Sequence, residues 1–194
     1  MVIAIDGPAG AGKSTVARKV ATALGYRYLD TGAMYRAVAL AALRAGVDTE
    51  DPVALAGLAG LAASMSDDLE LRSPEVERRV SRVARHREVR DALHVAQRTF
   101  LAGGDAVAEG RDVGAVVWPE AELKVWLDAD PQVRARRRVC EQGDSAAAAA
   151  LAERDRLDAA QTLQAPDAVA IDSTELDSDA VVERIVALAR EAGA

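Results

Sequence analysis

The sequence of 194 residues has few of the side chains that form disulfides and protein-held metal sites, with one cysteine and two histidines. Because Cys140 is the single cysteine, the chain can form neither an intramolecular disulfide nor a thiolate metal cluster. Nothing therefore indicates an oxidising compartment. His86 and His94 have no partner at metal-ligand spacing, and we expect both on helix surfaces. The sequence has no apolar run of membrane-spanning length and no leader-like start, so we expect a cytoplasmic protein without membrane attachment.

Positive charge is also scarce. Lysine and arginine number 24 against 31 aspartates and glutamates, which gives a net charge of −7. This balance has the wrong sign for a broad nucleic-acid-binding face, so no nucleic-acid partner is expected and any bound phosphate needs a local basic pocket. Half of the residues are apolar and 28% are charged, as in globular proteins. The length fits one domain with or without an insert, and a monomer is expected.

Short apolar runs alternate with helical patterns along most of the chain. The predicted strands are Val2–Asp6, Tyr26–Asp30, Ala106–Glu109, Leu123–Asp128 and Val169–Asp172. The predicted helices are Lys13–Leu24, Ala33–Ala45 capped by Thr31, an arginine-rich segment Val133–Asp158, and Val181–Ala192. Strands that alternate with helices favour an α/β fold with a parallel sheet covered on both faces.

Residues 47–101 break this alternation. One short strand candidate, Leu69–Leu71, lies among mostly helical patterns such as Val76–Phe100. We interpret this region as an insert upon a core formed by residues 1–46 and 102–194.

The strongest signal is G-P-A-G-A-G-K-S at residues 7–14, between the first predicted strand and the first predicted helix. It satisfies G-x-x-x-x-G-K-[ST], the phosphate-binding P-loop, in the context that this motif requires. Its glycines let backbone N–H groups point at phosphate oxygens, Lys13 adds a mobile charge, and Ser14 is placed to ligate Mg²⁺. The predicted ATP-binding residues are Gly7, Pro8, Ala9, Gly10, Ala11, Gly12, Lys13, Ser14 and Thr15.

Other P-loop classes fit less well. A guanine-specific switch normally needs an N-K-x-D motif, and the sequence has no asparagine. A translocating ATPase usually needs a larger core. Arginines gather between residues 134 and 156, and arginine suits planar phosphate recognition, although a solvated helix face or GC-rich coding explains such a cluster equally well. A small kinase is the best interpretation.

Further segments carry distinctive motifs. These are L-D-T-G-A-M-Y-R (29–36), S-P-E-V-E-R-R-V-S (73–81), A-E-G-R-D-V-G (108–114) and E-R-D-R-L-D (153–158). In this order and with the P-loop, they closely resemble the bacterial cytidylate kinase family over nearly the whole chain. The resemblance implies a nucleoside-monophosphate-kinase-like sheet of five strands and an arginine-rich lid at about 134–161. It also implies phosphoryl transfer from Mg–ATP to CMP and dCMP.

By motif position, the resemblance assigns roles to individual residues. The implied catalytic residues are Lys13, Arg111 and Arg154. The implied CMP-binding residues are Thr31, Tyr35 and Arg36 on the first motif, Ser81 and Arg90 on the insert, and Arg111, Asp112 and Asp158 beyond it. Among them Ser81, Arg90 and Asp112 would read the cytosine edge. No general base is needed, because the second pKa of a nucleoside monophosphate is near about 6.

The sequence departs from the family pattern in the lid, which typically continues E-R-D-x-R-D-x-x-R. Leu157 and Gln161 stand at two of its arginine positions. Loss of a charge at the transferring phosphoryl group would slow turnover strongly, unless Arg134, Arg137 or Arg156 substitutes. The insert is also shorter than the family's usual one.

Two alternatives stay open. One is another small P-loop kinase that acts on a different nucleotide or metabolite. The other is a nucleotide-binding protein with impaired transfer, in which the altered lid leaves binding intact.

Overall fold

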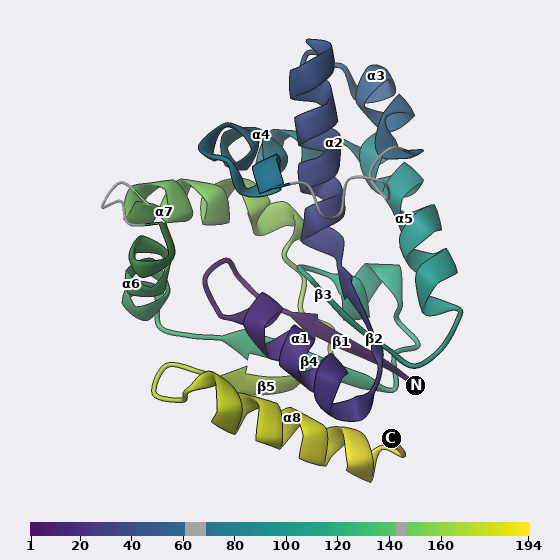
Figure 1. Cartoon of the computed structure of the whole chain (residues 1–194), viewed down its shortest axis with the longest axis vertical. Helices are drawn as coiled ribbons and strands as arrows, with labels where there is room; N and C mark the ends of the chain where they lie inside the picture. The colour runs from purple at the N-terminus through teal and green to yellow at the C-terminus, as the bar shows by residue number, and fades with distance from the viewer. Residues whose placement is uncertain (61–68, 143–146) are drawn as a thin grey trace. The chain divides into compact units, whose positions relative to one another are not determined.

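The computed structural model describes residues 1–60, 69–142 and 147–194. Five strands form one sheet in the order β2-β3-β1-β4-β5 (Figure 1). Their bounds are Val2–Asp6 (β1), Arg27–Asp30 (β2), Ala106–Gly110 (β3), Leu123–Asp128 (β4) and Val169–Asp172 (β5). The sheet is parallel and all five predicted core strands are confirmed. Because β1 pairs with both β3 and β4, the loop that follows β1 lies at the centre of the carboxyl edge, where open α/β sheets bind ligands.

Two helices, α1 (Lys13–Leu24) and α8 (Ser178–Glu191), cover one face of the sheet and run side by side in Figure 1. A hydrophobic core lies between these helices and the strands. Fully buried Ile3 and Ile5 of β1 pack against their apolar faces. The helix α1 ends at Gly25, whose φ of 70° is the left-handed conformation that terminates helices. Both helices are confirmed predictions.

The opposite face of the sheet carries η3 (Val113–Val117), a single turn of π-helix that follows β3. A Cβ atom on Gly114 would lie 3.4 Å from the Cβ of Ala4 and 3.1 Å from Cγ of Lys124, so glycine permits this close approach. The N–H of Trp118 donates to the carbonyl of Val113, five residues earlier, at 2.7 Å, which is the hydrogen bond of a π turn. Such π turns occur frequently at functional sites.

Two further helices, α6 (Pro131–Gln142) and α7 (Ala147–Asp158), occupy the segment predicted as one helix from Val133 to Asp158. Residues 143–146 of the expected lid, between them, lie outside the described residues. A short turn, η4 (Ala159–Gln161), follows α7.

The chain divides into two compact units, residues 1–29 with 101–194, and residues 30–100. The second unit contains α2 (Thr31–Ala45), α3 (Pro52–Gly57), η2 (Leu69–Arg72), α4 (Pro74–Ala84) and α5, which runs on to Leu101 from Arg87. Buried Leu40 of α2 belongs to the same cluster as Leu55, Val76 and Leu93. The helix α2 therefore joins the insert, which was expected to begin only at residue 47. Residues 61–68 of that insert lie outside the described residues.

Two local predictions are wrong. The candidate strand Leu69–Leu71 forms part of the 3₁₀ turn η2, in which the N–H of Ser73 donates to Glu70. Within the described part of this unit no strand is present to complete a ladder, so the chain closes its own short-range bonds. The helical pattern predicted over Val76–Phe100 is confirmed, as the two helices α4 and α5. The cap of α2 is Asp30, whose Oδ1 accepts the N–H of Ala33 at 2.7 Å, and not Thr31.

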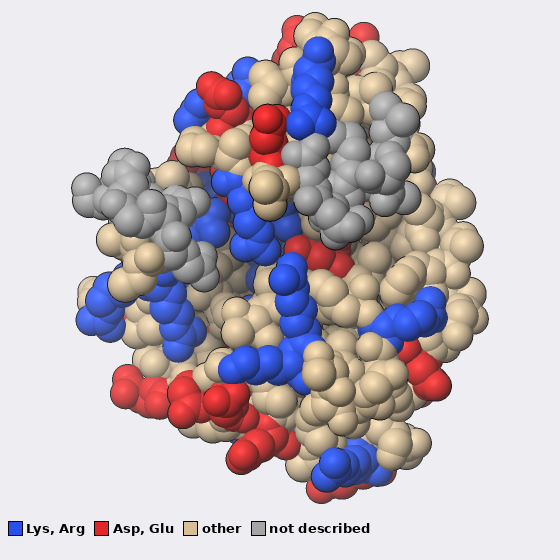
Figure 2. Space-filling view, viewed as in Figure 1, with Lys and Arg blue, Asp and Glu red and all other residues tan. Residues whose placement is uncertain are grey.

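Negative charge is concentrated on part of the first unit. Asp172 at the end of β5 and Asp177 and Asp179 at the start of α8 are exposed, and acidic side chains gather there at the lower left of Figure 2.

In the described ranges no helix is both long and apolar enough to cross a membrane.

Candidate functional site

The P-loop connects β1 to α1, as predicted, and its glycines are required by space and by backbone angle. A Cβ on Gly7 would lie 2.0 Å from the carbonyl oxygen of Leu127, and Gly12 has a φ of 91° at the start of α1. No other residue fits the first position without displacing β4. The N–H groups of the loop and of the helix N-terminus thus form a cradle suited to phosphate oxygens.

Lys13 is buried and bends over this loop, with Nζ donating to the carbonyl of Pro8 at 2.7 Å. Burial, together with the nearby charges of Arg111 and Arg154, lowers the pKa of Lys13 from 10.5 to about 7, whereas Glu109 and Asp6 oppose the shift. The ammonium lies at the P-loop, where an incoming anion would stabilise its charge.

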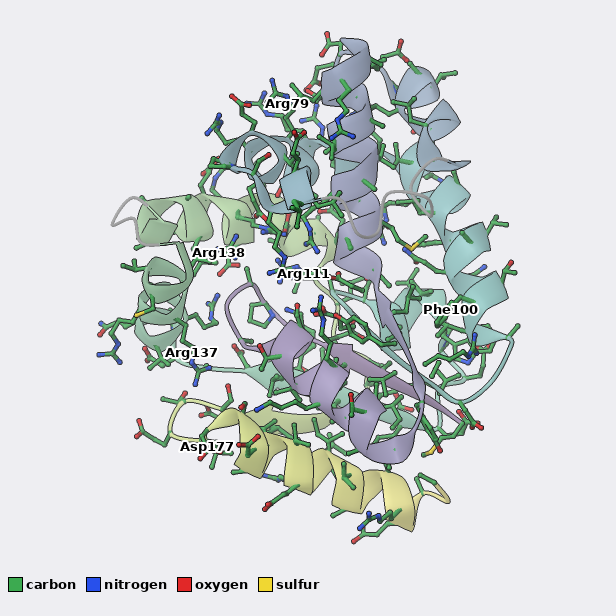
Figure 3. The ribbon with its side chains drawn as sticks, in the orientation of Figure 1. Arg79, Phe100, Arg111, Arg137, Arg138 and Asp177 are labelled. Atoms are coloured by element: carbon green, nitrogen blue, oxygen red, sulfur yellow. The ribbon has the colours of Figure 1, made fainter. Side chains whose placement is uncertain are left out.

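Arg111 connects the P-loop with α7. Arg111 is labelled in Figure 3. Its Nη1 donates to the carbonyl of Gly7 at 2.9 Å, and its Nη2 donates to Oδ2 of Asp158 at 3.0 Å. Arg154 lies one helical turn before Asp158, with Nε 3.5 Å from the same carboxylate oxygen. Burial and the charge of Arg154 lower the pKa of Arg111, whereas Asp158 opposes this change. Arg111, Arg154 and Asp158, each predicted for the site, therefore form one cluster.

Asp6 is a residue of this site that sequence reasoning missed. It is 3% exposed at the end of β1, and its two carboxylate oxygens accept the N–H groups of Val113 and Gly114, each at 2.8 Å. Burial raises the pKa of Asp6 to about 6, whereas the two hydrogen bonds oppose this rise. The available signal was one acidic residue in an otherwise apolar strand, directly before the P-loop.

In the second unit the motif L-D-T-G-A-M-Y-R forms a basic site around Arg36. The Nη2 of Arg36 donates to Oδ2 of Asp30 at 2.9 Å, and both side chains are about a tenth exposed. A Cβ on Gly32 would lie 3.1 Å from Nη1 of Arg36 and 3.2 Å from Oδ1 of Asp30, so glycine leaves room for the pair. The Nε of Arg36 is buried without a hydrogen-bond partner among the described residues. This donor is suited to an anionic ligand.

The other predicted CMP-binding residues are distributed over both units. Ser81 is buried on α4 and Arg90 is half-buried on α5, in the same unit as Thr31 and Tyr35 on α2. Asp112 is buried at the start of η3 in the first unit, with Arg111 and Asp158. Each unit thus carries part of the predicted set.

The candidate replacements for the two missing lid arginines have different environments. Arg134 on α6 is buried, donates to the P-loop carbonyl of Ala9 at 3.0 Å, and pairs with Asp155 of α7. Arg137 donates to the carbonyl of Ser173 at 2.6 Å, after β5. Arg156 is exposed and pairs with Glu153 on its own helix. Of the three, Arg134 contacts the P-loop.

The P-loop also has a donor suited to Mg²⁺. Ser14 lies in the first turn of α1, half-buried, next to Lys13. A hydroxyl beside phosphate oxygens supplies the hard oxygen ligands that this ion prefers. In the ranges that the structure describes, no cluster of three His, Cys, Asp or Glu side chains is placed to hold a metal.

The histidines differ from their prediction. His94 is buried on α5, and His86 lies in the connection between α4 and α5, where Nε2 is 2.8 Å from the carbonyl oxygen of Thr49. Neither is on a helix surface. Cys140 is exposed, as expected of a thiol on a helix.

A P-loop after the central strand of a five-stranded parallel sheet, surrounded by buried cations, defines a P-loop kinase. The family model described as cytidylate kinase matches residues 3–191, so the chain belongs to the cytidylate kinase family. A cytidylate kinase of Pelotomaculum thermopropionicum is 44% identical, with 95% of this chain and 94% of the relative covered. One of Exiguobacterium sibiricum is also 44% identical, with 98% and 97% covered.

Solved structures show the same fold at low sequence identity. A gluconokinase of Sinorhizobium meliloti superposes with a TM-score of 0.57 and 19% identity, over 98% of this chain and 93% of its own. A shikimate kinase of Acinetobacter baumannii gives a TM-score of 0.51 and 13% identity, over 99% and 94%. These similarities concern the fold alone.

Proposed function

We propose that this chain transfers the γ-phosphoryl group of ATP to CMP and dCMP, giving ADP and CDP or dCDP. The observation that carries the proposal is that two cations from distant parts of the chain meet one P-loop. Lys13 contacts the carbonyl of Pro8, and Arg111 contacts that of Gly7. The membership in the cytidylate kinase family supports CMP as the acceptor.

On the donor side, the N–H groups of residues 7–15 would bind the ATP phosphates, and Lys13 would leave Pro8 to contact the outer ones. Ser14 would hold Mg²⁺, which when bound neutralises charge between these phosphates. The glycines matter because a side chain at Gly7 or Gly10 would occupy space already taken by the backbone of β4 or α6.

On the acceptor side, we assign Arg111, Arg36 and Tyr35 to the CMP phosphate, with Thr31 beside them. Asp158 and Arg154 would meet the ribose and the lid side of the phosphates, and Ser81, Arg90 and Asp112 the cytosine edge. The buried Nε of Arg36 supports an anionic ligand at that side chain, and the hydrogen bonds of Arg111 to Gly7 and Asp158 support a fixed guanidinium within its own unit. A guanidinium held by carboxylate and carbonyl partners is already oriented before the acceptor binds.

The transfer then needs alignment and charge neutralisation. An oxygen of the CMP phosphate, already anionic at pH 7, forms a bond to the γ-phosphorus while the bond to the β–γ bridging oxygen breaks and ADP leaves. Lys13, Arg111 and Arg154 would stabilise the charge that spreads over the transferred group. Closure of residues 134–161 as a lid would exclude water, which otherwise competes as acceptor. We place this activity in cytoplasmic pyrimidine nucleotide metabolism and expect a monomer.

The deciding experiment measures ADP release with Mg–ATP and CMP, dCMP, UMP, AMP, GMP or no acceptor, and identifies the diphosphate product. We expect strong CMP and dCMP signals above the control without acceptor. Equal rates with UMP or AMP would favour a kinase of different acceptor range. ATP binding without acceptor-dependent ADP would mean that the changes at Leu157 and Gln161 have left a nucleotide-binding protein, or that the acceptor is a different molecule.

A further inference from the structure

Asp6 is bonded to the turn that presents two predicted site residues. Its Oδ1 and Oδ2 each accept one backbone N–H, from Val113 and Gly114, at 2.8 Å. These donors directly follow Asp112, and they are more than one hundred residues from Asp6 in the sequence. The carboxylate therefore fixes the start of η3 to the last residue of β1.

Gly7, the first residue after β1, also contacts this turn. Gly7, which follows Asp6, accepts from Nη1 of Arg111 at 2.9 Å. Two adjacent residues at the P-loop thus fix the backbone after Asp112 and the guanidinium before it. A shift of η3 relative to the P-loop would move Arg111 and Asp112 together relative to Lys13.

The chemistry at this position is unusual for a strand core. The rest of β1, Val-Ile-Ala-Ile, is apolar and buried, and a buried carboxylate is costly unless its partners compensate it. The charge of Asp112 raises the pKa of Asp6 and that of Lys13 lowers it. Glu109 of the neighbouring β3 in turn raises the pKa of Lys13. Burial raises the pKa of Asp6 to about 6, so ionisation here opposes folding. A role in positioning explains why the sequence places a carboxylate at this point.

We propose that Asp6 is a positioning residue for phosphoryl transfer, which holds the turn between β3 and η3 so that Arg111 and Asp112 keep a constant distance from Lys13. The inference rests on the proposed function, because Arg111 and Lys13 act on acceptor and donor phosphates there. Asp6 itself contacts no substrate in this scheme.

The test is Asp6→Asn in the full chain, assayed with CMP and ATP at pH 7.5. Asparagine keeps the shape but offers one acceptor oxygen, and its NH₂ group faces the second N–H donor. We expect kcat to fall about 10-fold to 100-fold, as small misplacements of catalytic groups do. The Kd for ATP, measured by calorimetry, should stay within about twofold, because the P-loop glycines are unchanged.

Asp179→Asn is the matched control. Asp179 is an exposed carboxylate at the start of α8 that accepts from Nζ of Lys19 at 2.7 Å, on the other face of the sheet from η3, and its variant should keep wild-type kinetics. A folded Asp6→Asn protein with kcat within twofold of wild type would overturn the proposal. An equal loss of ATP affinity and kcat would also overturn it, since that pattern indicates damage to the P-loop itself.

A double-mutant cycle checks the route of the effect. If Asp6 acts through Arg111, Asp6→Asn should lower kcat less in an Arg111→Lys background than in the wild type. Effects that multiply independently would contradict the inference. Should Asp6→Asn fail to fold, the wild-type amide resonances of Val113 and Gly114 should titrate with one shared midpoint. Separate or absent titrations would overturn the proposal.

The outcomes also separate this inference from the proposed function. Wild-type protein without CMP-dependent ADP release would refute the proposed function. The Asp6 contacts would then be judged by the amide titration alone. Normal wild-type activity with an unaffected Asp6→Asn variant would refute only the positioning role.

Discussion

The guanidinium of Arg111 is held on two sides, by Oδ2 of Asp158 at 3.0 Å and by the carbonyl of Gly7 at 2.9 Å. Asp158 ends α7, whereas Gly7 begins the P-loop, so one side chain joins the expected lid to the phosphate cradle. The side chains of Arg111 and Asp158 are each less than a fifth exposed, which limits screening of this ion pair by solvent.

Replacement of Asp158 by Asn should therefore reduce kcat/KM for CMP by about 10-fold to 100-fold, because Arg111 loses a charged acceptor and the ribose would lose the partner that we propose for it. The KM for ATP should change less. Steady-state kinetics with each substrate varied would measure this split. Glu153→Gln, which removes an exposed ion pair with Arg156 on the same helix, is the control and should have no effect.

Lys13→Met should lower kcat by about 100-fold to 1000-fold, the usual loss when a charge-stabilising donor is removed. The fold should persist, because methionine fills the buried stem and removes an ammonium whose pKa burial has already lowered to about 7. Thermal unfolding checks the fold and the coupled assay checks turnover. Lys19→Met, on the exposed face of α1, should behave as wild type; near-normal turnover of Lys13→Met would contradict the mechanism.

Gly32→Ala should raise the KM for CMP by about tenfold while the KM for ATP stays constant. The new methyl group would meet Nη1 of Arg36 at 3.1 Å and disturb its pair with Asp30, on the acceptor side only. Gly57→Ala is matched to it, because a Cβ there meets nothing within 4 Å. Equal changes in both KM values would remove Arg36 from the acceptor site.

Asp6 should make stability depend on pH in a defined direction. Because its folded pKa, about 6, lies above the ordinary 3.8, the folded chain retains a proton that the unfolded chain loses. Its contribution is therefore fully present below about pH 4 and is lost as pH rises through 6. Urea unfolding of wild type and Asp6→Asn at pH 4 and 7.5 should show this difference, at most about 3 kcal/mol. A difference independent of pH would refute it.

Gln161→Arg should raise kcat by about threefold to tenfold if the lid charge that the family pattern has at this position acts on the transferred group. Gln161 is half-buried in η4, close to Asp158 in the sequence. Gln164→Arg adds the same charge at an exposed position three residues later and serves as the control. If both variants match wild type, Arg134 at the P-loop already supplies the missing charge.

Much of the fold could be predicted because its signals are local. The apolar runs of β1 and β4, the helix-ending Gly25 and the P-loop spacing depend on neighbouring residues only. Prediction failed where the local sequence fits two alternative structures equally well. Leu69–Leu71 has strand-like residues but no described strand to pair with, and Asp30 displaced Thr31 as the cap because its carboxylate reaches the N–H of Ala33.

The sequence by itself determined the phosphate cradle, the parallel strands that carry it and the family to which the chain belongs, because motif order and spacing are properties of the linear chain. Only the tertiary structure decided which distant groups meet. Asp6 finds the amides of η3, Arg111 joins Gly7 to Asp158, and His94 becomes buried. These contacts depend on strand order and helix packing, which place residues more than forty positions apart within hydrogen-bond distance.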